Sequence, residues 1–123
     1  MVENYKDLEV WKRSIALITV LYKLTAKFPA TECYGLVTQI RRASISIAAN
    51  IAEGWGRGSR GEYIQFLTVA RGSLMELETH LIIANNLHFL KPEDLVSAQV
   101  MTKKIEKMLN RLITVLRQKR VRA

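Results

Sequence analysis

Residues 36–54 constrain the fold of this chain more than any other segment. Apolar residues recur there at steps of three and four, which is the spacing of one helix face: Leu36, Ile40, Ala43, Ile47 and Ile51. A second row at the same spacing is polar and consists of Gln39, Arg42, Ser46, Asn50 and Glu53. Because buried polar groups require hydrogen-bond partners, we expect another helix, another subunit or a ligand to face this row.

Two helices are predicted in the first half of the chain. The first spans about residues 7–27 and ends before Pro29, because the residue preceding a proline avoids helical dihedrals. The second is expected to start at an N-cap on Thr31 and to stop at Gly54, since threonine caps helix N-termini and glycine follows helix C-termini.

Two more helices are predicted in the second half. Ser59 and Glu62 have the spacing of a capping box at the start of the third helix, which a three-four apolar repeat extends to Ala84. Pro92 suits the first position of the fourth helix. Short connections place neighbouring helices antiparallel. The sequence therefore predicts an all-α protein, an antiparallel up-down-up-down four-helix bundle.

The chain has the length and composition of a single domain. With 123 residues and 49% hydrophobic side chains, it can bury one core. We assign residues 1–116 to the bundle and expect the basic tail, residues 117–123, to fray into solvent. The polar N-terminus, the single cysteine (Cys33) and the lack of a long apolar run predict a cytoplasmic protein without a membrane span.

The first helix is apolar over a wider arc than one bundle core can cover. The arc includes Trp11, Leu17, Leu21 and Leu24. Apolar surface that a monomer leaves exposed marks interaction sites. We therefore expect part of this helix to be buried between subunits.

Positive charge is concentrated near the C-terminus. The net charge is +8, and residues 91–123 hold nine basic and three acidic side chains. Such asymmetry favours a polyanion or an acidic protein surface as the partner. The candidate phosphate-contacting residues are Lys103, Lys104, Lys107, Arg111, Arg117, Lys119 and Arg120. The alternative is an ordinary solvated face whose lysines favour the helix C-terminus.

The glycine-rich segment 54–61 contains a G-x-G-x-x-G pattern. A dinucleotide site requires a strand before such a turn, whereas a helix is predicted here. Arg57 and Arg60, with the free N–H groups of the third helix, form a candidate phosphate site. The favoured alternative is a tight connection that needs glycine dihedrals, with Trp55 as a packing anchor.

The polar row of the second helix has two interpretations, a structural network or a catalytic cluster. Its members besides Gln39 are Arg42, Ser46, Asn50 and Glu53. Glu76 on the third helix is the expected partner of Arg42 or Asn50, because the small residues 72–73 beside it permit close approach. A carboxylate and an arginine without a histidine, cysteine or metal pattern favour the structural network.

No cofactor or metal centre is predicted. Di-iron bundles place a histidine three residues after a glutamate, and neither His80 nor His88 has that spacing. Glu76 and His80 are one helical turn apart, which permits a surface pair but not a site by itself.

Several segments resemble a bacterial protein family. They are Tyr5-Lys-Asp-Leu-Glu-Val-Trp11, Phe28-Pro29, Gly35-Leu36, Gln39-Ile-Arg-Arg-Ala-Ser, Asn50-Ile-Ala-Glu-Gly54, Gly56-Arg57 and Gly72-Ser73 with Glu76. They resemble the four-helix-bundle proteins encoded in intervening sequences of 23S ribosomal RNA genes. That family is similar to the accessory variability determinant proteins of diversity-generating retroelements. The resemblance runs from Tyr5 to about Leu90.

The resemblance implies a bundle that assembles into a ring-shaped homopentamer, with no catalytic residue to carry over. The accessory relatives are basic and bind nucleic acid and a reverse transcriptase. Our leading hypothesis is a non-catalytic, oligomeric protein that binds nucleic acid, either RNA, which we favour, or DNA, through its basic face. The alternative is an adaptor that docks an acidic protein partner such as a reverse transcriptase. An enzyme is the third hypothesis and requires the region of Arg42 and Glu76 to be an accessible pocket.

Overall fold

Four long helices account for most of residues 3–122, the part of the chain that the computed structural model describes, with side chains described through residue 118. No strand occurs in this part. Two short 3-10 turns, η1 and η2, precede the first and second helices. The elements are η1 (Tyr5–Asp7), α1 (Glu9–Thr25), η2 (Ala30–Glu32), α2 (Leu36–Gly56), α3 (Arg60–Asn86) and α4 (Pro92–Arg122).

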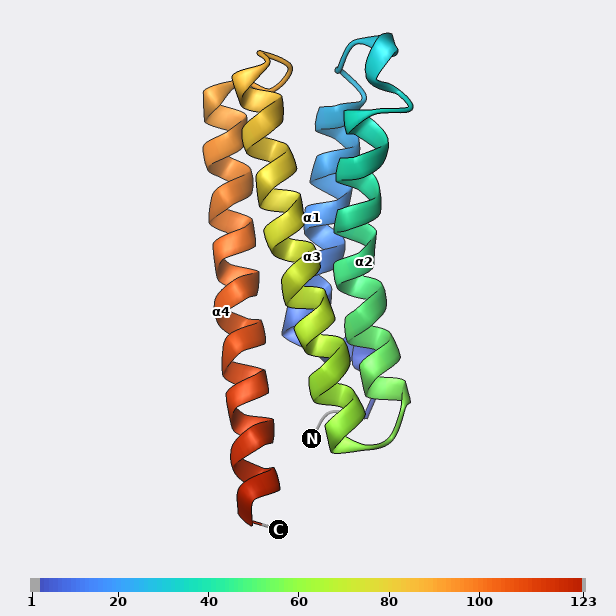
Figure 1. Cartoon of the computed structure of the whole chain (residues 1–123), viewed down its shortest axis with the longest axis vertical. Coiled ribbons are helices and arrows are strands. Elements are labelled where there is room, and N and C mark those ends of the chain that lie inside the picture. The colour runs from blue at the N-terminus through green and yellow to red at the C-terminus, as the bar shows by residue number, and fades with distance from the viewer. Residues whose placement is uncertain (1–2, 123) are drawn as a thin grey trace.

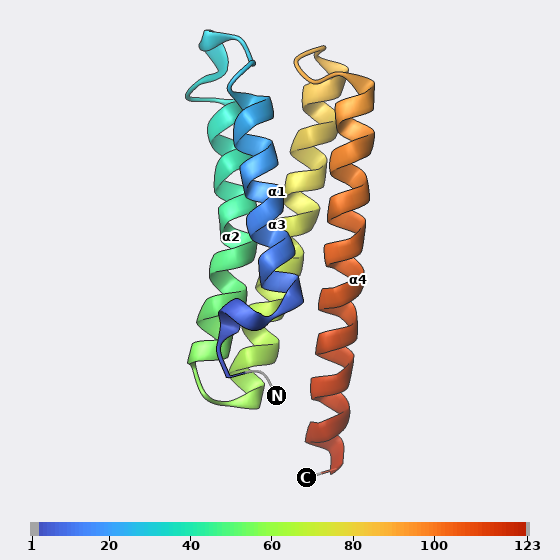
Figure 2. The ribbon, with the colours of Figure 1, turned by 180° about the vertical axis from the view of Figure 1, so that it is seen from behind.

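The helices form the predicted bundle. The chain rises through α1, descends through α2, rises through α3 and descends through α4 (Figure 1). Each helix packs against two neighbours, and the contact of α4 with α1 closes the bundle. Seen from behind, α1 lies between α2 and α4 (Figure 2). The contact between α2 and α3 is the most extensive, and their outer seam carries the polar row.

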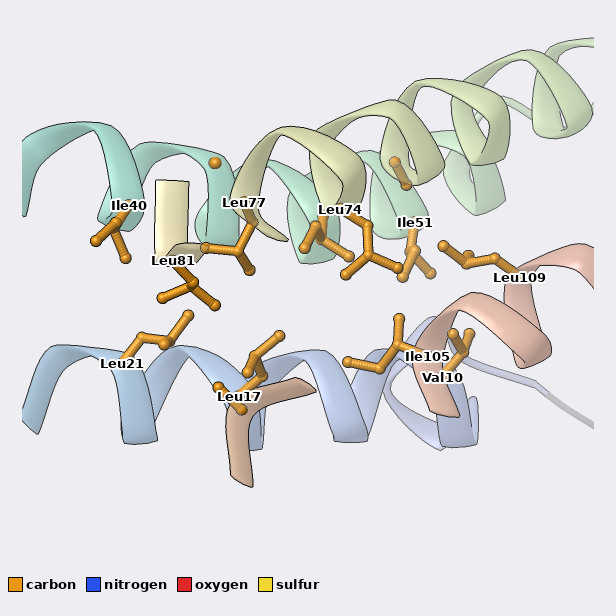
Figure 3. Close-up of a cluster of buried hydrophobic side chains, with 14 of the residues drawn as sticks. Val10, Leu17, Leu21, Ile40, Ile51, Leu74, Leu77, Leu81, Ile105 and Leu109 are labelled. Atoms are coloured by element: carbon orange, nitrogen blue, oxygen red, sulfur yellow. The ribbon is translucent and has the colours of Figure 1, made fainter. Parts of the chain in front are cut away.

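The core is a column of aliphatic side chains contributed by all four helices (Figure 3). Burying each such side chain stabilises the fold by about 1.5–3 kcal/mol before entropy costs. The large side chains with no more than 1% exposure are Leu17, Leu21, Ile40, Ile47, Ile51, Leu67, Leu74, Leu77, Leu81, Ile105, Leu109 and Ile113.

The two apolar stripes of α1 have different environments. Leu17 and Leu21 lie wholly in the core, whereas Ile15 and Tyr22 on the other stripe remain 39% and 38% exposed. The wide apolar arc is therefore only partly covered within one chain. On α4, Val115 lies outside the core at 38% exposure.

Both predicted ends of α2 were wrong. Thr31 lies in η2, and α2 begins after Gly35, where the Oε1 atom of Glu32 accepts a hydrogen bond of 3.2 Å from the N–H of Leu36. That carboxylate replaces the threonine cap, since it satisfies one of the free N–H groups at the helix start. At the other end, α2 continues through Gly54 to Gly56, because Gly54 is buried against α3.

The predicted starts of α3 and α4 are confirmed. The N–H of Glu62 donates to the Oγ atom of Ser59 over 3.2 Å, and that hydroxyl donates to the Glu62 carboxylate over 3.0 Å. Pro92 is the first residue of α4. Arg117 and Gln118 lie in this helix, and the fraying of residues 117–123 stays a prediction. Within the described residues, no helix has the length and hydrophobicity that a membrane span requires.

Candidate nucleic-acid interface

Four of the predicted basic residues lie on the outer face of α4. Ile105, Leu109 and Ile113 point into the core, so side chains about half a turn away point outward. The basic face, as we call it, consists of the exposed cations Lys103, Lys104, Lys107 and Arg111 on this outer side, while Arg117 is exposed four residues after core-facing Ile113. None of them forms an ion pair within 4.0 Å among the side chains described. The side chains of Lys119 and Arg120 lie outside the described part.

The first half of the same face is apolar. Val96 and Val100 are 58% and 66% exposed. With Lys103 and Glu78 they line a groove of about 430 Å³ between α3 and α4. The hydroxyl of Thr102 donates to the Glu78 carboxylate over 3.2 Å. The outer face of α4 therefore changes from apolar to basic toward the C-terminus.

The two arginines of the turn between α2 and α3 differ in their surroundings. The Nε atom of Arg57 lies 3.1 Å from a Glu53 carboxylate oxygen, and its Nη1 atom lies 3.8 Å from one of Glu62. Its guanidinium also lies 5.0 Å from the ring centre of Phe66. Arg60 is exposed and has no carboxylate partner in the described region. Of this pair, Arg60 is the arginine with an uncompensated charge.

The turn itself is a tight connection between two helices. Gly58 has a φ of 81°, in the left-handed region that favours glycine. Trp55 is half-buried and packs edge-on against Tyr63, with ring centroids 6.1 Å apart. These features agree with the favoured interpretation of the segment. Since α2 precedes the turn, the glycine pattern is not in the strand-turn-helix context of a dinucleotide site.

Three members of the seam between α2 and α3 form a hydrogen-bond network. The hydroxyls of Ser46 and Ser73 lie 2.8 Å apart and join the two helices. The Nδ2 atom of Asn50 donates to the carbonyl of Ser46 over 2.8 Å and to its hydroxyl over 3.0 Å. All three side chains are half-buried, so these bonds replace water that the seam excludes.

The charged residues expected in this network are exposed and are not joined to it: Glu53 pairs with Arg57, and neither Arg42 nor Glu76 of α3 bonds to the serines or to Asn50. Arg42 and Glu76 are exposed and line an open groove of about 400 Å³ with Gln39, Ser46 and Ser73. Among residues 3–118 no ion pair joins Arg42 to Glu76, whose carboxylate lies 3.7 Å from the Nε2 atom of His80. Exposed ion pairs gain little free energy, so nothing draws the two long side chains together.

Of the two small residues at which α2 and α3 were expected to approach closely, only Ser73 lies at the contact. Ser73 contacts Ser46, whereas a Cβ atom on Gly72 would meet no atom within 4 Å. The expected partnership of Glu76 with Asn50 is also absent, since Asn50 bonds to Ser46 on its own helix. The region of Arg42 and Glu76 is thus an accessible groove and not a buried network.

Sequence reasoning missed Arg41, the neighbour of Arg42. Its Nε atom donates to the Thr25 hydroxyl over 3.0 Å, and Nη2 donates to the Tyr22 carbonyl over 3.3 Å. The guanidinium also stacks on the Tyr22 ring at 4.2 Å. Arg41 thereby joins α2 to the C-terminal end of α1, where its charge also favours the helix dipole.

It also missed the polar end of Tyr63. The hydroxyl of this residue is buried and has no hydrogen-bond partner in the described structure. Burial raises the pKa of Tyr63 from 10.0 to about 12. The signal that could have revealed it is a tyrosine at a core position of the α3 repeat, because such a position buries the hydroxyl as well as the ring. No group of side chains in the described residues has the composition of a metal site.

The comparisons with known proteins place the chain in a family. It matches the family described as 23S rRNA-intervening sequence protein over residues 6–111. It is also similar to the crystal structure of a protein with unknown function from the S23 ribosomal protein family of Bacteroides thetaiotaomicron. That similarity covers 85% of this chain and 97% of the other, with 27% sequence identity and a TM-score of 0.75.

No curated protein matches the chain. The family match nevertheless covers most of the bundle, from the middle of η1 into the second half of α4. The solved structure supports the same fold over nearly its whole length. This chain therefore belongs to the 23S rRNA-intervening sequence protein family.

Proposed function

We propose that this chain is a non-catalytic, oligomeric protein of the cytoplasm that binds nucleic acid through the basic face of α4. One observation carries the proposal: four exposed cations lie on the outer face of one helix, with a fifth at Arg117 farther along it, and none has a carboxylate partner among residues 3–118. RNA is the favoured nucleic acid on the family resemblance described above. The free, exposed Cys33 fits the reducing cytoplasm.

The chemistry of the basic face suits phosphates better than bases. Lysine and arginine side chains that neutralise phosphates release counterions, which gives affinity without sequence preference. The four cations from Lys103 to Arg111 recur within about two helical turns on one side of α4. They can therefore follow the backbone of one strand.

Assembly supports this function by multiplying weak contacts. An apolar face on α1 and α2 remains uncovered in one chain and consists of Ile15, Ile18, Tyr22 and Ile45. Ile15 is 39% exposed, Tyr22 38% and Ile45 43%, while Ile18 is half-buried. We propose that this α1–α2 face packs between subunits, in the ring-shaped homopentamer that the family resemblance implies. Several basic faces on one ring would bind a polyanion with avidity.

The test is direct binding of unstructured single-stranded RNA and of duplex DNA by the full chain across a salt series. If five phosphates are contacted, affinity for the single strand falls about a hundredfold between 50 and 200 mM salt. An absence of binding at the lowest salt would remove the proposal.

The second candidate function is an adaptor that docks an acidic protein such as a reverse transcriptase. The observation that favours it is the exposed pair Val96 and Val100 directly before the basic face, since apolar surface is a feature of protein interfaces. Serine at both positions discriminates the two functions. An adaptor loses its partner, whereas a phosphate-binding face keeps its affinity for RNA.

A further inference from the structure

A small pocket lies at the end of the bundle where α2 turns into α3. Its volume is about 240 Å³, and its lining is mainly apolar: Gly54, Trp55, Gly58, Ser59, Arg60, Tyr63 and Leu116. Leu116 belongs to α4, so three helices contribute to this pocket, which we call the Trp55–Tyr63 pocket. The turn between α2 and α3 and the last turns of α4 lie toward the same end of the molecule (Figure 1).

Two aromatic rings form a corner in this pocket. The rings of Trp55 and Tyr63 meet at 86° with their centroids 6.1 Å apart. A flat aromatic group that stacks on one of these rings therefore points its edge at the second ring. Stacked and edge-to-face arrangements are both favourable between aromatic rings. Gly54 permits the corner, because a Cβ atom there would lie 3.1 Å from the Cδ1 atom of Tyr63.

Tyr63 also carries a polar group without a partner in the described structure. The Tyr63 hydroxyl is buried and makes no hydrogen bond within the described structure. Leaving such a group unpaired destabilises the fold. Because the hydroxyl is buried, a base in the pocket meets the ring of Tyr63 and not its oxygen.

Positive charge adjoins the pocket. Arg60 lines it and has no carboxylate partner in the described region. Arg117 follows Leu116 directly on α4 and is exposed. Arg57 contributes less, since Glu53 and Glu62 offset its charge. An aromatic surface beside cations is the combination that binds single-stranded nucleic acids.

We propose that the Trp55–Tyr63 pocket takes one unstacked base of a single-stranded nucleic acid, with Arg60 on the adjoining phosphate. The proposal rests on the nucleic-acid-binding function proposed above and adds a preference for single strands. At 240 Å³ the pocket is smaller than sites for drug-sized ligands, which begin at about 300 Å³. It therefore suits one planar ring system and not a whole nucleotide cofactor. Paired bases inside a duplex cannot enter it.

The first measurement uses Trp55 as its own reporter. The chain has two tryptophans, and Trp11→Phe leaves Trp55 as the only one. A base stacked on the indole changes its emission. We therefore expect single-stranded RNA, such as a twelve-nucleotide oligouridine or oligoadenosine, to quench Trp55 in W11F with a saturation curve that matches binding. A duplex of the same length should leave the emission unchanged.

The second measurement compares two variants that each remove an aromatic ring. Trp55→Leu keeps apolar volume in the pocket but removes the stacking surface, and should weaken single-strand binding about tenfold. The matched control is Tyr34→Leu, because Tyr34 is 96% exposed and lies in the turn between α1 and α2 at the opposite end of the bundle (Figure 2). Y34L should bind as the unmodified chain does, and melting temperatures confirm that both variants fold.

The possible outcomes separate this proposal from the proposed function. In one outcome the chain binds single-stranded RNA with strong salt dependence, W55L and Y34L bind it with the same affinity, and Trp55 emission is constant. The pocket proposal is then wrong and phosphate binding stands. If W55L loses single-strand and duplex binding equally, no base enters the pocket. If the unmodified chain binds no nucleic acid at low salt, the proposed function fails and the pocket proposal with it.

Discussion

At the scale of single residues, Gly54 sets how closely α2 approaches α3. A Cβ atom at this position would lie 2.8 Å from the Cβ atom of Phe66 and 3.3 Å from the carbonyl oxygen of Tyr63. The first distance is too short for any real contact, and the second involves backbone that cannot swing aside. Only glycine therefore fits at this crossing.

Alanine at two glycines should accordingly have opposite effects on stability. Gly54→Ala gains helix propensity but overpacks the crossing, which costs about 1–3 kcal/mol, so a net loss is expected. Gly72→Ala lies in the middle of α3 with no atom within 4 Å of the new methyl group, and should gain about 0.5–1 kcal/mol. Urea unfolding measures both. A G54A variant as stable as G72A would mean that the helices are not in this contact.

The Tyr63 hydroxyl predicts a pH dependence with a defined sign. Its pKa is raised to about 12 by burial, from 10.0. Below pH 10 the folded and unfolded chains both keep the proton, so this group leaves stability constant there. Between pH 10 and 12 the unfolded chain releases the proton and the folded chain holds it, so stability falls.

Tyr63→Phe should therefore flatten this part of the stability profile. It should also leave stability at pH 7 unchanged or slightly higher, because the variant removes an unpaired buried hydroxyl. The matched control is Tyr34→Phe at the exposed turn. Urea midpoints at pH 9, 10 and 11 are the measurement. If the urea midpoint of Y63F falls with pH as steeply as that of Y34F, the hydroxyl is not buried.

At the scale of helices, the seam between α2 and α3 depends on short polar side chains. Ser46 bonds across it to Ser73 and along its own helix to Asn50. Removing one partner leaves a half-buried hydroxyl unpaired, which costs more than removing both. Ser73→Ala should therefore destabilise the bundle by about 1 kcal/mol, and adding Ser46→Ala should recover part of the loss.

A double-mutant cycle of these two serines gives the coupling energy. The control is Arg42→Met, which should change stability by less than about 0.5 kcal/mol because Arg42 is exposed on this seam. Additive serine effects, or a large effect of R42M, would show that the charged residues hold the seam instead.

The helices could be predicted from the sequence more readily than their ends. Apolar periodicity over 15 or more residues predicts a helix wherever it packs, so all four were found. The C-terminal end of α2 depends on contacts: Gly54 has the residue type of a helix terminator but is buried at a crossing. At its start, Glu32 reaches the first N–H group and displaces the expected cap on Thr31.

The faces of the helices were harder to predict than the helices. Both stripes of α1 are apolar, so the pattern alone did not distinguish core-facing Leu17 from partly exposed Ile15. On α2, adjacent arginines differ by about 100° around the helix axis. That rotation points the Arg41 side chain against α1 and the Arg42 side chain into an open groove. Which of two similar residues packs against a neighbouring helix is decided by the tertiary arrangement and not by the residue type.

At the scale of the whole molecule, the α1–α2 face predicts self-association. Ile45→Glu introduces a charge into this face and should shift the assembly toward monomer, because an unpaired charge in an interface is costly. Ile82→Glu is the matched control, since Ile82 is similarly exposed, 45% against 43%, but lies on α3. Light scattering at micromolar concentration is the measurement. A stable species of 14.1 kDa for the unmodified chain would contradict the assembly.

The central claim is that the basic face of α4 binds phosphates, and charge removal tests it most directly. One variant replaces Lys103, Lys107 and Arg111 with glutamine. Its control makes the same change at Lys12, Lys23 and Lys27, which are exposed on α1 or directly after it. Both variants lose three charges, so a general effect of net charge is the same in each. Circular dichroism checks that both keep the bundle.

The measurement is the slope of the logarithm of affinity against the logarithm of salt concentration, with single-stranded RNA as ligand. The α4 variant should bind more weakly, with a slope flatter by about two units, since each lost contact contributes about 0.7. The α1 control should keep a slope close to that of the unmodified chain. Equal slopes for the two triple variants would contradict the assignment of phosphate binding to α4.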